Sequence, residues 1–403
     1  MKKSLLIFAI LVFAQAMQAQ TKPREAAQYI EYNNPFYGKI LESLGDGPYT
    51  PRRVMKAVPK MALPLSHTEF ETVWCNKPLS QGRTGTCWSF STSSFYESEI
   101  FRKTKKEIKV SELYTVYFEY LAKAEEYIKT TGKSHLGEGS ETNALARQMK
   151  AHGMVPASAY SGNAKNTTYL DHQKMFDEFK ALLENHKARG AWDKEVILAG
   201  VKAILSTYMG TPPKTFYYNR QAYDPMTFMR DIAKINPEEY VNVMSLKKYP
   251  YWTHAEWDVP DNYWNSKDYL NVPLDDFMEG LKKAVQDGYS VSLGGDVSGP
   301  GYLPSKSVAI VPEFDIPADY IDEYSRQLRF DNGSTSDDHA IHVIGYKEDT
   351  DGKWWFLIKD SGSSARNGVD PGYFFFHEDY VKLKMMTYTV HQNAILNIVN
   401  KVR

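Results

Sequence analysis

The sequence is poor in cysteine, with only Cys75 and Cys87 among 403 residues. Two thiols cannot supply a cysteine-rich zinc site, and no His-Glu-x-x-His motif is present. A disulfide scaffold is not needed, because a chain of this length buries enough apolar surface to fold without one. A single Cys75–Cys87 bridge remains open as an oxidised off-state. Nothing in the sequence implies a metal or organic cofactor, and a reducing environment would keep the thiols available for chemistry.

The sequence also has almost no net charge. Its 48 Lys and Arg residues nearly balance 49 Asp and Glu residues, which leaves a net charge of −1. No block of five or six like charges occurs, so we expect no nucleic-acid partner. After residue 19, no stretch approaches the ~18 apolar residues of a membrane-spanning helix. We therefore expect no membrane association of the mature chain. With 42% hydrophobic residues, it has the composition of an ordinary globular protein.

Residues 1–19 are the exception and carry an apolar run. Lys2-Lys3 precede Leu5–Ala14, and small residues follow at Ala16 and Ala19. This order predicts a secretory signal peptide that is cleaved after Ala16 or Ala19. The alternative is a membrane anchor, but the run is too short to cross a hydrocarbon core of ~30 Å. We therefore expect an exported protein, periplasmic or extracellular.

The segment Gln81–Trp88 has the features of a nucleophile loop. Two glycines between Gln81 and Cys87 allow a tight turn, and the run after Cys87 has no Gly or Pro to break a helix over residues 86–103. In the first turn of that helix, unpaired N–H groups and the helix dipole favour a thiolate sulfur. A backbone N–H and the Gln81 amide could stabilise an oxyanion. The alternative is that Cys87 is a small buried side chain with no catalytic role.

Helical and β-rich segments divide the rest of the chain. Apolar residues recur at helical spacing in the first half, and β-rich runs with an Asp-Gly turn signal fill the last quarter. Predicted helices cover residues 110–128, 141–152, 169–208 (a pair) and 274–286, and predicted strands cover 289–293, 339–346, 353–359, 373–376 and 385–398. Residues 20–64, punctuated by proline, are predicted to lie over the body as an extended segment. The fold class is α+β.

A thiol nucleophile needs a base and a group that orients the base. His339 opens a predicted strand, and Asp360 follows the strand across the hairpin. Antiparallel pairing would bring these two ends together. His342 competes for the role, but three positions along a strand reverse the side-chain direction, so only one of the two histidines can face a cleft. Spacing alone leaves the choice between them open.

Together these residues resemble the papain clan of cysteine peptidases. The matching stretches are Gln81, Gly85-Thr-Cys87-Trp88, Asp338-His339-Ala340 and Ile358-Lys-Asp360-Ser361-Gly362. Within the clan, the chain resembles the bleomycin hydrolase and aminopeptidase C branch, through three further segments in matching order: Gly137–Pro156, Tyr208–Phe216 and Asp287–Val297. The resemblance covers the chain from about residue 60 to the end.

The resemblance implies a fold of two lobes with a cleft between them. Residues 65–160 would form a helical lobe, residues 161–290 a helical insertion typical of the family, and residues 291–403 a β-barrel-like lobe. The implied catalytic residues are Cys87 as nucleophile, His339 as base and then acid, Asp360 as the group that orients it, and Gln81 in the oxyanion hole. The implied substrate-binding residues are Trp88, Glu138, Gly139, Ser140 and Asp338.

The sequence departs from the family pattern in ways that bear on activity. Asp360 stands where the family usually has Asn, and we expect activity to persist with a shifted alkaline limb, because an anion stabilises imidazolium more strongly. Ser140 replaces a second glycine, which predicts a narrower cleft. In this branch a C-terminal arm offers its carboxylate to the free amine of the substrate. That arm is short here, and Glu138 is our hypothesis for the replacement carboxylate.

We therefore expect an exported cysteine peptidase that acts on peptides or proteins. By resemblance, aminopeptidase activity is the preferred expectation. An open cleft predicts endopeptidase cleavage instead. An inactive binding module would have lost Cys87, Gln81 or His339, and none is lost. A thiol acyltransferase with the same pair would transfer to an added amine faster than it hydrolyses. Members of the family often assemble, so a homo-oligomer is left open.

Overall fold

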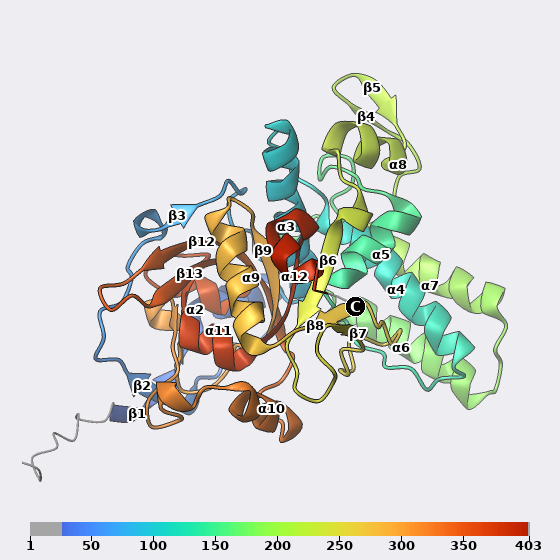
Figure 1. Ribbon diagram of the computed structural model, residues 1–403. Helices are drawn as coiled ribbons and strands as arrows, with labels where there is room; N and C mark the ends of the chain where they lie inside the picture. The colour runs from blue at the N-terminus through green and yellow to red at the C-terminus, as the bar shows by residue number, and fades with distance from the viewer. Residues whose placement is uncertain (1–25, 402–403) are drawn as a thin grey trace, which may run out of the picture.

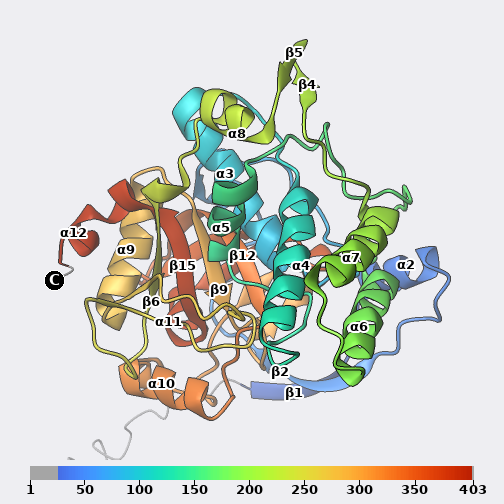
Figure 2. The same cartoon turned by 90° about the vertical axis from the view of Figure 1, so that its right-hand side faces the viewer.

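The computed structural model describes residues 26–401, so the signal peptide predicted for residues 1–19 lies outside the described part. Helices α3 to α7 gather on one side of the molecule, and a large mixed sheet with α9 occupies the other (Figures 1 and 2). Each group has its own hydrophobic cluster. The structure is therefore α+β, as predicted, with helices and strands segregated rather than alternating.

Helix α3 (Cys87–Thr104) lies between the two groups and packs against strands β12 and β9. Every residue from Trp88 to Ile100 is buried. Small Ser and Thr side chains let the helix approach the sheet closely, and the hydroxyls of Ser91 and Thr92 each meet the Ser292 hydroxyl at 2.9 Å. The helix predicted for residues 86–103 is therefore confirmed.

The other predicted helices of the first half are also present. They are α4 (Glu112–Lys129), α5 (Asn143–His152), α6 (Gln173–Ala188) and α7 (Lys194–Met209). The Ser111 side chain caps α4 by accepting a bond from the Tyr114 N–H at 3.2 Å. Helices α6 and α7 form the predicted hairpin, with Gly190 at φ +61° between them. Their apolar stripes pack with α4 into one cluster.

The main sheet has the strand order β10-β11-β14-β13-β12-β9-β15-β6-β8-β7, with β3 paired beside β12. Its strands are β3 (Glu71–Thr72), β6 (Tyr240–Met244), β7 (Thr253–Ala255), β8 (Tyr269–Asn271), β9 (Val291–Gly295), β10 (Tyr302–Leu303), β11 (Val308–Ala309), β12 (His339–Glu348), β13 (Trp354–Lys359), β14 (Tyr373–His377) and β15 (Met385–His391). Alternate residues of β12 face opposite sides. Ile341 and Val343 join the cluster that contains helix α9 (Leu274–Gln286), whereas His342 faces α3.

Residues 161–290 contain strands as well as helices, and some of the strands belong to the main sheet. After α7 come the β4–β5 hairpin (Phe216–Tyr218 and Gln221–Tyr223) and the single turn α8 (Pro225–Thr227). Strands β6 and β8 then join the main sheet, and α9 packs on it. Strand β6 pairs with β15, which lies far away in the sequence, and β8 pairs with β6. No helix among residues 26–401 is long and apolar enough to span a membrane.

The N-terminal segment contains structure that the sequence reading missed. Strands β1 (Ala26–Tyr32) and β2 (Arg52–Val58) form an antiparallel ribbon, and helix α2 (Pro35–Ser43) lies between them in sequence. Asn34 caps α2, and Pro35 stands at its first position, which is a recognisable helix start. Three short helices of the last quarter were also missed, namely α10 (Glu323–Asp331), α11 (Glu378–Lys384) and α12 (Leu396–Val399).

Candidate active site

Cys87 is the first residue of α3, so its backbone N–H has no acceptor within the helix. The loop before it is held by tight backbone contacts. Gly82 has φ +67°, and a Cβ at this position would meet the Leu170 carbonyl oxygen at 2.2 Å. The Gly85 N–H donates to the Glu138 carboxylate at 2.7 Å. The two glycines therefore fix the loop that presents the thiol, as the sequence indicates.

His339 and Asp360 come together at the open end of the β12–β13 pair, where His342 is opposite Lys359. His339 Nε2 is 2.8 Å from Asp360 Oδ1, which also accepts the Gly362 N–H at 2.7 Å. Because Nε2 bonds Asp360, Nδ1 is left to face a nucleophile. The Cys87 thiol lies close enough to His339 to raise the pKa of the imidazole. The helical group and the sheet thus bring one sulfur, one imidazole and one carboxylate into a chain of contacts.

Burial and nearby charge have opposite effects on the pKa of His339. Burial lowers the pKa of His339, but the Asp360 carboxylate and the Cys87 thiol outweigh it, and the pKa lies well above its usual value. Burial likewise raises the pKa of Asp360, yet the charge of His339 and the hydrogen bonds to the carboxylate hold it below its usual value. Asp360 is only 2% exposed, so water screens this attraction little. The arrangement favours an imidazolium beside a carboxylate.

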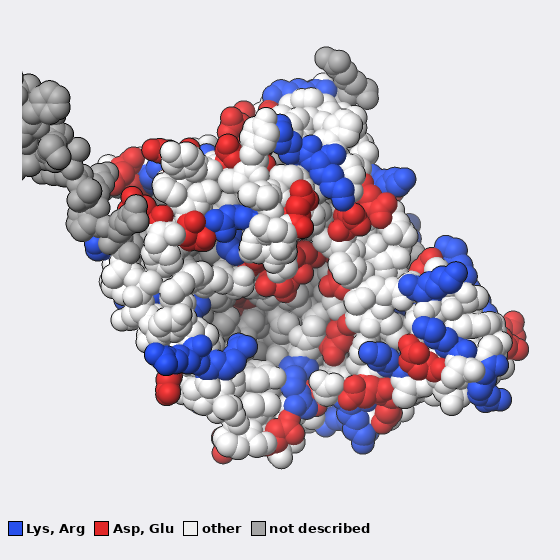
Figure 3. Space-filling view, turned by 90° about the horizontal axis from the view of Figure 1, so that it is seen from below, with Lys and Arg blue, Asp and Glu red and all other residues white. Residues whose placement is uncertain are grey.

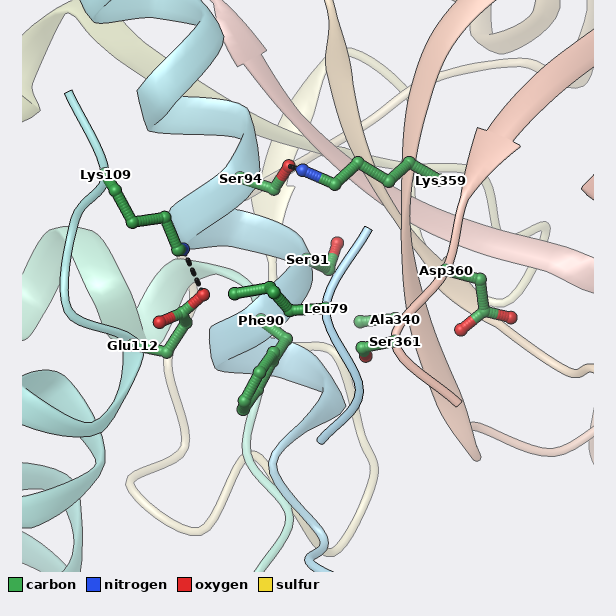
Figure 4. Close-up of a pocket in the computed structure, with 10 residues that line it drawn as sticks. All are labelled: Leu79, Phe90, Ser91, Ser94, Lys109, Glu112, Ala340, Lys359, Asp360 and Ser361. Atoms are coloured by element: carbon green, nitrogen blue, oxygen red, sulfur yellow. Dashed lines mark hydrogen bonds and ion pairs between the residues drawn. The ribbon is translucent and has the colours of Figure 1, made fainter. Parts of the chain in front are cut away.

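His342 is directed elsewhere, which resolves the choice between the two histidines. It is fully buried, and its Nδ1 lies 2.8 Å from the Ser94 hydroxyl, which also accepts a bond from Lys359 Nζ at 2.7 Å. Burial and the Lys359 charge hold the pKa of His342 well below its usual value. Figure 4 shows Ser94 and Lys359 pointing toward each other beside a cavity of about 20 Å³. That volume holds about one water molecule, so no peptide enters there.

An open cleft of about 390 Å³ lies beside His339. Its lining comes from the loop before Cys87, from the loop after Asp360 and from α2: Tyr37, Gln81–Gly85, Glu138, Gln173, Val297, His339 and Gly362–Ser364. Gln81 is fixed within this wall. Its Nε2 donates to the Thr84 carbonyl oxygen at 2.7 Å, and its Oε1 accepts the Ser361 hydroxyl at 2.7 Å. One amide hydrogen of Gln81 therefore remains for a ligand.

Comparison with known proteins agrees with this geometry. The family model described as the Peptidase C1-like family matches residues 133–402, more than half of the chain. The chain belongs to the Peptidase C1-like family. The matched residues include His339 and Asp360, while Gln81 and Cys87 precede them. Membership in this family makes the chain a cysteine peptidase and confirms the resemblance to the papain clan.

The chain is similar to a curated protein in sequence and to a solved structure in fold. Aminopeptidase C of Streptococcus thermophilus is 22% identical over 321 residues, which are 68% of this chain and 71% of that protein. The crystal structure of PepW from Lactobacillus rhamnosis HN001 superposes with a TM-score of 0.67 at 18% identity, and the match covers 82% of this chain and 83% of that one. The chain thus shares its fold with PepW and is a C1-like peptidase related to aminopeptidase C.

The residues predicted at the substrate take different positions in this C1-like site. Trp88 does not line the cleft, because it is fully buried and its indole N–H donates to the Glu138 carbonyl oxygen at 3.2 Å. The Ser140 hydroxyl turns inward and donates to buried Glu119 at 2.7 Å. Asp338 is exposed, and its carboxylate accepts the Val297 N–H at 2.9 Å. The side chains of Trp88 and Ser140 therefore point into the protein interior and do not line the cleft.

Gly139 and Glu138 remain near the surface of the site. A Cβ on Gly139 would meet the Asp261 carboxylate at 2.0 Å, so glycine permits this close approach. The Glu138 side chain lines the cleft, but its carboxylate already accepts the Gly85 N–H. Burial raises the pKa of Glu138, and the Gly85 bond opposes that rise. Glu138 therefore stabilises the nucleophile loop while its side chain still lines the cleft.

The N-terminal segment adds residues that sequence reasoning did not assign to the site. Tyr37 of α2 lines the cleft, and Asn34 donates to the Ser363 hydroxyl at 3.0 Å. Arg83, in the nucleophile loop, forms ion pairs with both Asp46 and Asp171. The segment that contains α2 thus contacts both walls of the cleft. No group of three or more His, Cys, Asp or Glu side chains within the described range could hold a metal ion.

Proposed function

We propose that the chain hydrolyses peptide bonds with Cys87 as nucleophile and His339 as general base and acid. The observation that carries the proposal is the chain of contacts from the Cys87 thiol through His339 to Asp360, with the His339–Asp360 distance of 2.8 Å. Asp360 orients the imidazole through Nε2 and stabilises its protonated form. The Cys87 sulfur can then remain negatively charged beside an imidazolium.

The proposed reaction passes through two tetrahedral states. The Cys87 sulfur attacks the peptide carbonyl carbon, and the backbone N–H of Cys87 and the free amide hydrogen of Gln81 donate to the oxyanion. His339 then protonates the leaving amine, and a thioester remains on Cys87. Water, deprotonated by His339, hydrolyses the thioester through a second oxyanion. The fixed position of Gln81 supports this role because its side chain needs no rearrangement to donate.

Aminopeptidase action is the first choice for specificity, because a relative over two thirds of the chain is aminopeptidase C. Endopeptidase action is the second, since the cleft beside His339 is open. The two-lobe description of the fold is part of the proposal and is supported by the separate hydrophobic clusters of the helices and the sheet. Subunit assembly remains open.

Export of the protein is also proposed, on the grounds of the charged, apolar and small-residue order of residues 1–19. Mass spectrometry of the protein purified from culture medium and from cell fractions tests it. We expect a mature N-terminus after Ala16 or Ala19. A chain that keeps residues 1–19 and stays in the cytoplasm would contradict export.

The catalytic proposal is tested with fluorogenic peptides that carry free or acetylated N-termini. Wild type should hydrolyse at least one class, and Cys87→Ala should lower kcat by about 10⁴-fold or more. Cys75→Ala is the matched control, because it removes the other thiol from a half-buried position outside the cleft. Full activity of Cys87→Ala would refute the assignment. Faster transfer to an added amine than to water would identify an acyltransferase instead.

A further inference from the structure

Helix α2 borders the part of the cleft that lies beside His339. Tyr37 of α2 lines this cleft together with His339 and with the loop before Cys87. In the proposed reaction His339 protonates the leaving amine, so the substrate residues that follow the scissile bond begin at this imidazole. The cleft that starts there therefore receives the leaving side of the substrate, and α2 bounds it.

One wall of the cleft holds the start of α2. Asn34, which caps the helix, is 7% exposed and donates to the Ser363 hydroxyl at 3.0 Å. The Asn367 side chain donates to the Asn34 side-chain oxygen at 2.7 Å and accepts the Phe36 N–H at 2.9 Å. These three bonds join α2 to the loop that follows Asp360. Because Asn34 is buried, water competes little for them.

The opposite wall holds the other end of the segment. Asp46, which follows α2, forms an ion pair with Arg83 of the nucleophile loop. Arg83 also pairs with Asp171 at 2.8 Å, so the guanidinium is held from two sides. The Phe36 ring meets the Tyr169 ring edge-on, with the centroids 5.6 Å apart. A segment that contacts both walls must cross the space between them.

The β1–β2 ribbon attaches the same segment to the sheet from outside the cleft. Lys56 Nζ donates to the carbonyl oxygens of Gly299 and Tyr302 at 2.9 and 2.7 Å. The Ala57 N–H donates to the Pro300 carbonyl oxygen at 3.0 Å. Since α2 lies between β1 and β2 in sequence, the ribbon restricts both of its ends. Figure 3 shows a hollow on the face seen from below, with side chains around it.

Tyr37 is the residue of α2 that reaches the cleft, and its position is fixed from behind. Its N–H donates to the Asn34 side chain at 2.9 Å, and its ring meets the Tyr49 ring edge-on with the centroids 6.1 Å apart. By contrast, Gly362, whose Cβ would lie 3.5 Å from the imidazole of His339, has no side chain. The space next to the imidazole is therefore free, and the Tyr37 ring limits how far that space extends.

We propose that the segment Asn34–Asp46 closes the leaving side of the cleft and limits the substrate to a short stretch after the scissile bond, with Tyr37 as the specificity-determining residue. The inference rests on the proposed peptidase function and gives it a substrate class, a peptide that ends soon after the bond that is cut. Such a peptide is either short as a whole or long and cut near its C-terminus. Cleavage in the middle of a long chain is disfavoured in both cases.

The test lengthens one substrate on its leaving side. The peptide that wild type cuts fastest is synthesised with one, two, four or six residues after the scissile bond, and products are quantified by chromatography. From two to six residues kcat/KM should fall by about tenfold or more, as exclusion from a shaped pocket typically gives. A value that is constant or rises with length overturns the inference and leaves the peptidase proposal intact.

A second series lengthens the same peptide before the scissile bond and distinguishes the two kinds of substrate. A constant kcat/KM in this series indicates cleavage near the C-terminus of long peptides. A fall indicates that the substrates are short as a whole.

Variants assign the length limit to the α2 segment. Tyr37→Ala should reduce the length dependence to within about threefold, whereas Tyr37→Trp should increase it. Asp46→Ala, which releases the segment from Arg83, should also favour the six-residue substrate. Tyr29→Ala is the matched control, because Tyr29 belongs to β1, is 66% exposed and does not line the cleft. An equal gain at every length in Tyr37→Ala would identify α2 as a general inhibitor and overturn the inference.

A binding measurement gives an answer without turnover. In calorimetry on Cys87→Ala, the peptide with two residues after the scissile bond should bind about tenfold more tightly than the peptide with six. Adding Tyr37→Ala should remove the difference. Equal affinities in Cys87→Ala contradict the length limit even if the peptidase proposal fails. A difference in affinity without hydrolysis by wild type would refute the peptidase proposal and retain the length limit.

Discussion

The charge of Asp360 should set the alkaline limit of activity, and Asp360→Asn isolates that charge. The amide keeps an oxygen that can accept the bond from His339 Nε2, so the imidazole stays oriented while its anionic partner disappears. Removing a negative charge beside an imidazolium lowers the pKa of the imidazolium. The alkaline limb of kcat/KM, on which His339 loses its proton, should therefore move to lower pH.

The size of the shift follows from the contact. Two unit charges ~4 Å apart attract each other by about 4 kcal/mol at an effective dielectric constant of ~20. Since one pKa unit corresponds to about 1.4 kcal/mol, the full attraction is worth about three units. Burial of the imidazole already opposes part of it in the wild type. The amide dipole restores some stabilisation, so we expect the alkaline limb to move down by about two pH units.

The assay is the pH profile of kcat/KM on one fluorogenic peptide, measured between pH 5 and 10. Asp319→Asn is the control, because it removes the same charge from an exposed position and should leave the limb unchanged. An alkaline limb that stays within a few tenths of a pH unit in Asp360→Asn would refute the charge argument. It would also show that an anion at this position adds nothing to the family's usual amide.

Three other substitutions test the site and its support. Gln81→Ala should lower kcat by about 10²-fold with a smaller change in KM, in steady-state kinetics, because one oxyanion donor is lost; a change in KM alone would exclude that role. Gly82→Ala should lower the thermal unfolding midpoint by several degrees, because the new Cβ clashes with Leu170 at positive φ. Glu97→Gln should cost about 3 kcal/mol in urea unfolding, because Lys109 loses a buried partner; a cost below 1 kcal/mol would contradict this.

Local sequence signals predicted much of the fold. The absence of Gly and Pro after Cys87 predicted helix α3. The helical spacing of apolar residues predicted helices α4 to α7 and α9. The Asp-Gly turn between two β-rich runs predicted that β12 pairs with β13. That pairing brings His339 close to Asp360. These features depend on residues close in sequence, where turn chemistry and periodicity act directly. Helix α2 was missed although Asn34-Pro35 signals a helix start.

Other features depended on packing across the chain. The sequence could not say that the Ser94 hydroxyl bonds His342 and also accepts a bond from Lys359, so it left two histidines open. The family resemblance implied that Trp88 binds substrate, whereas packing turns the ring into the core. The sequence also could not show that the Glu138 carboxylate accepts the Gly85 N–H across more than 50 residues.

By itself the sequence determined a cysteine at the start of a helix and a hairpin with a histidine near one end and Asp360 at the other. Both are local, because helix termini and hairpin turns bring together residues that are near neighbours along the chain. Only the tertiary structure decided that α3 packs on β12, which brings Cys87 to His339. Such contacts join residues about 200 or more positions apart, and burial of the surfaces between helices and sheet decides them.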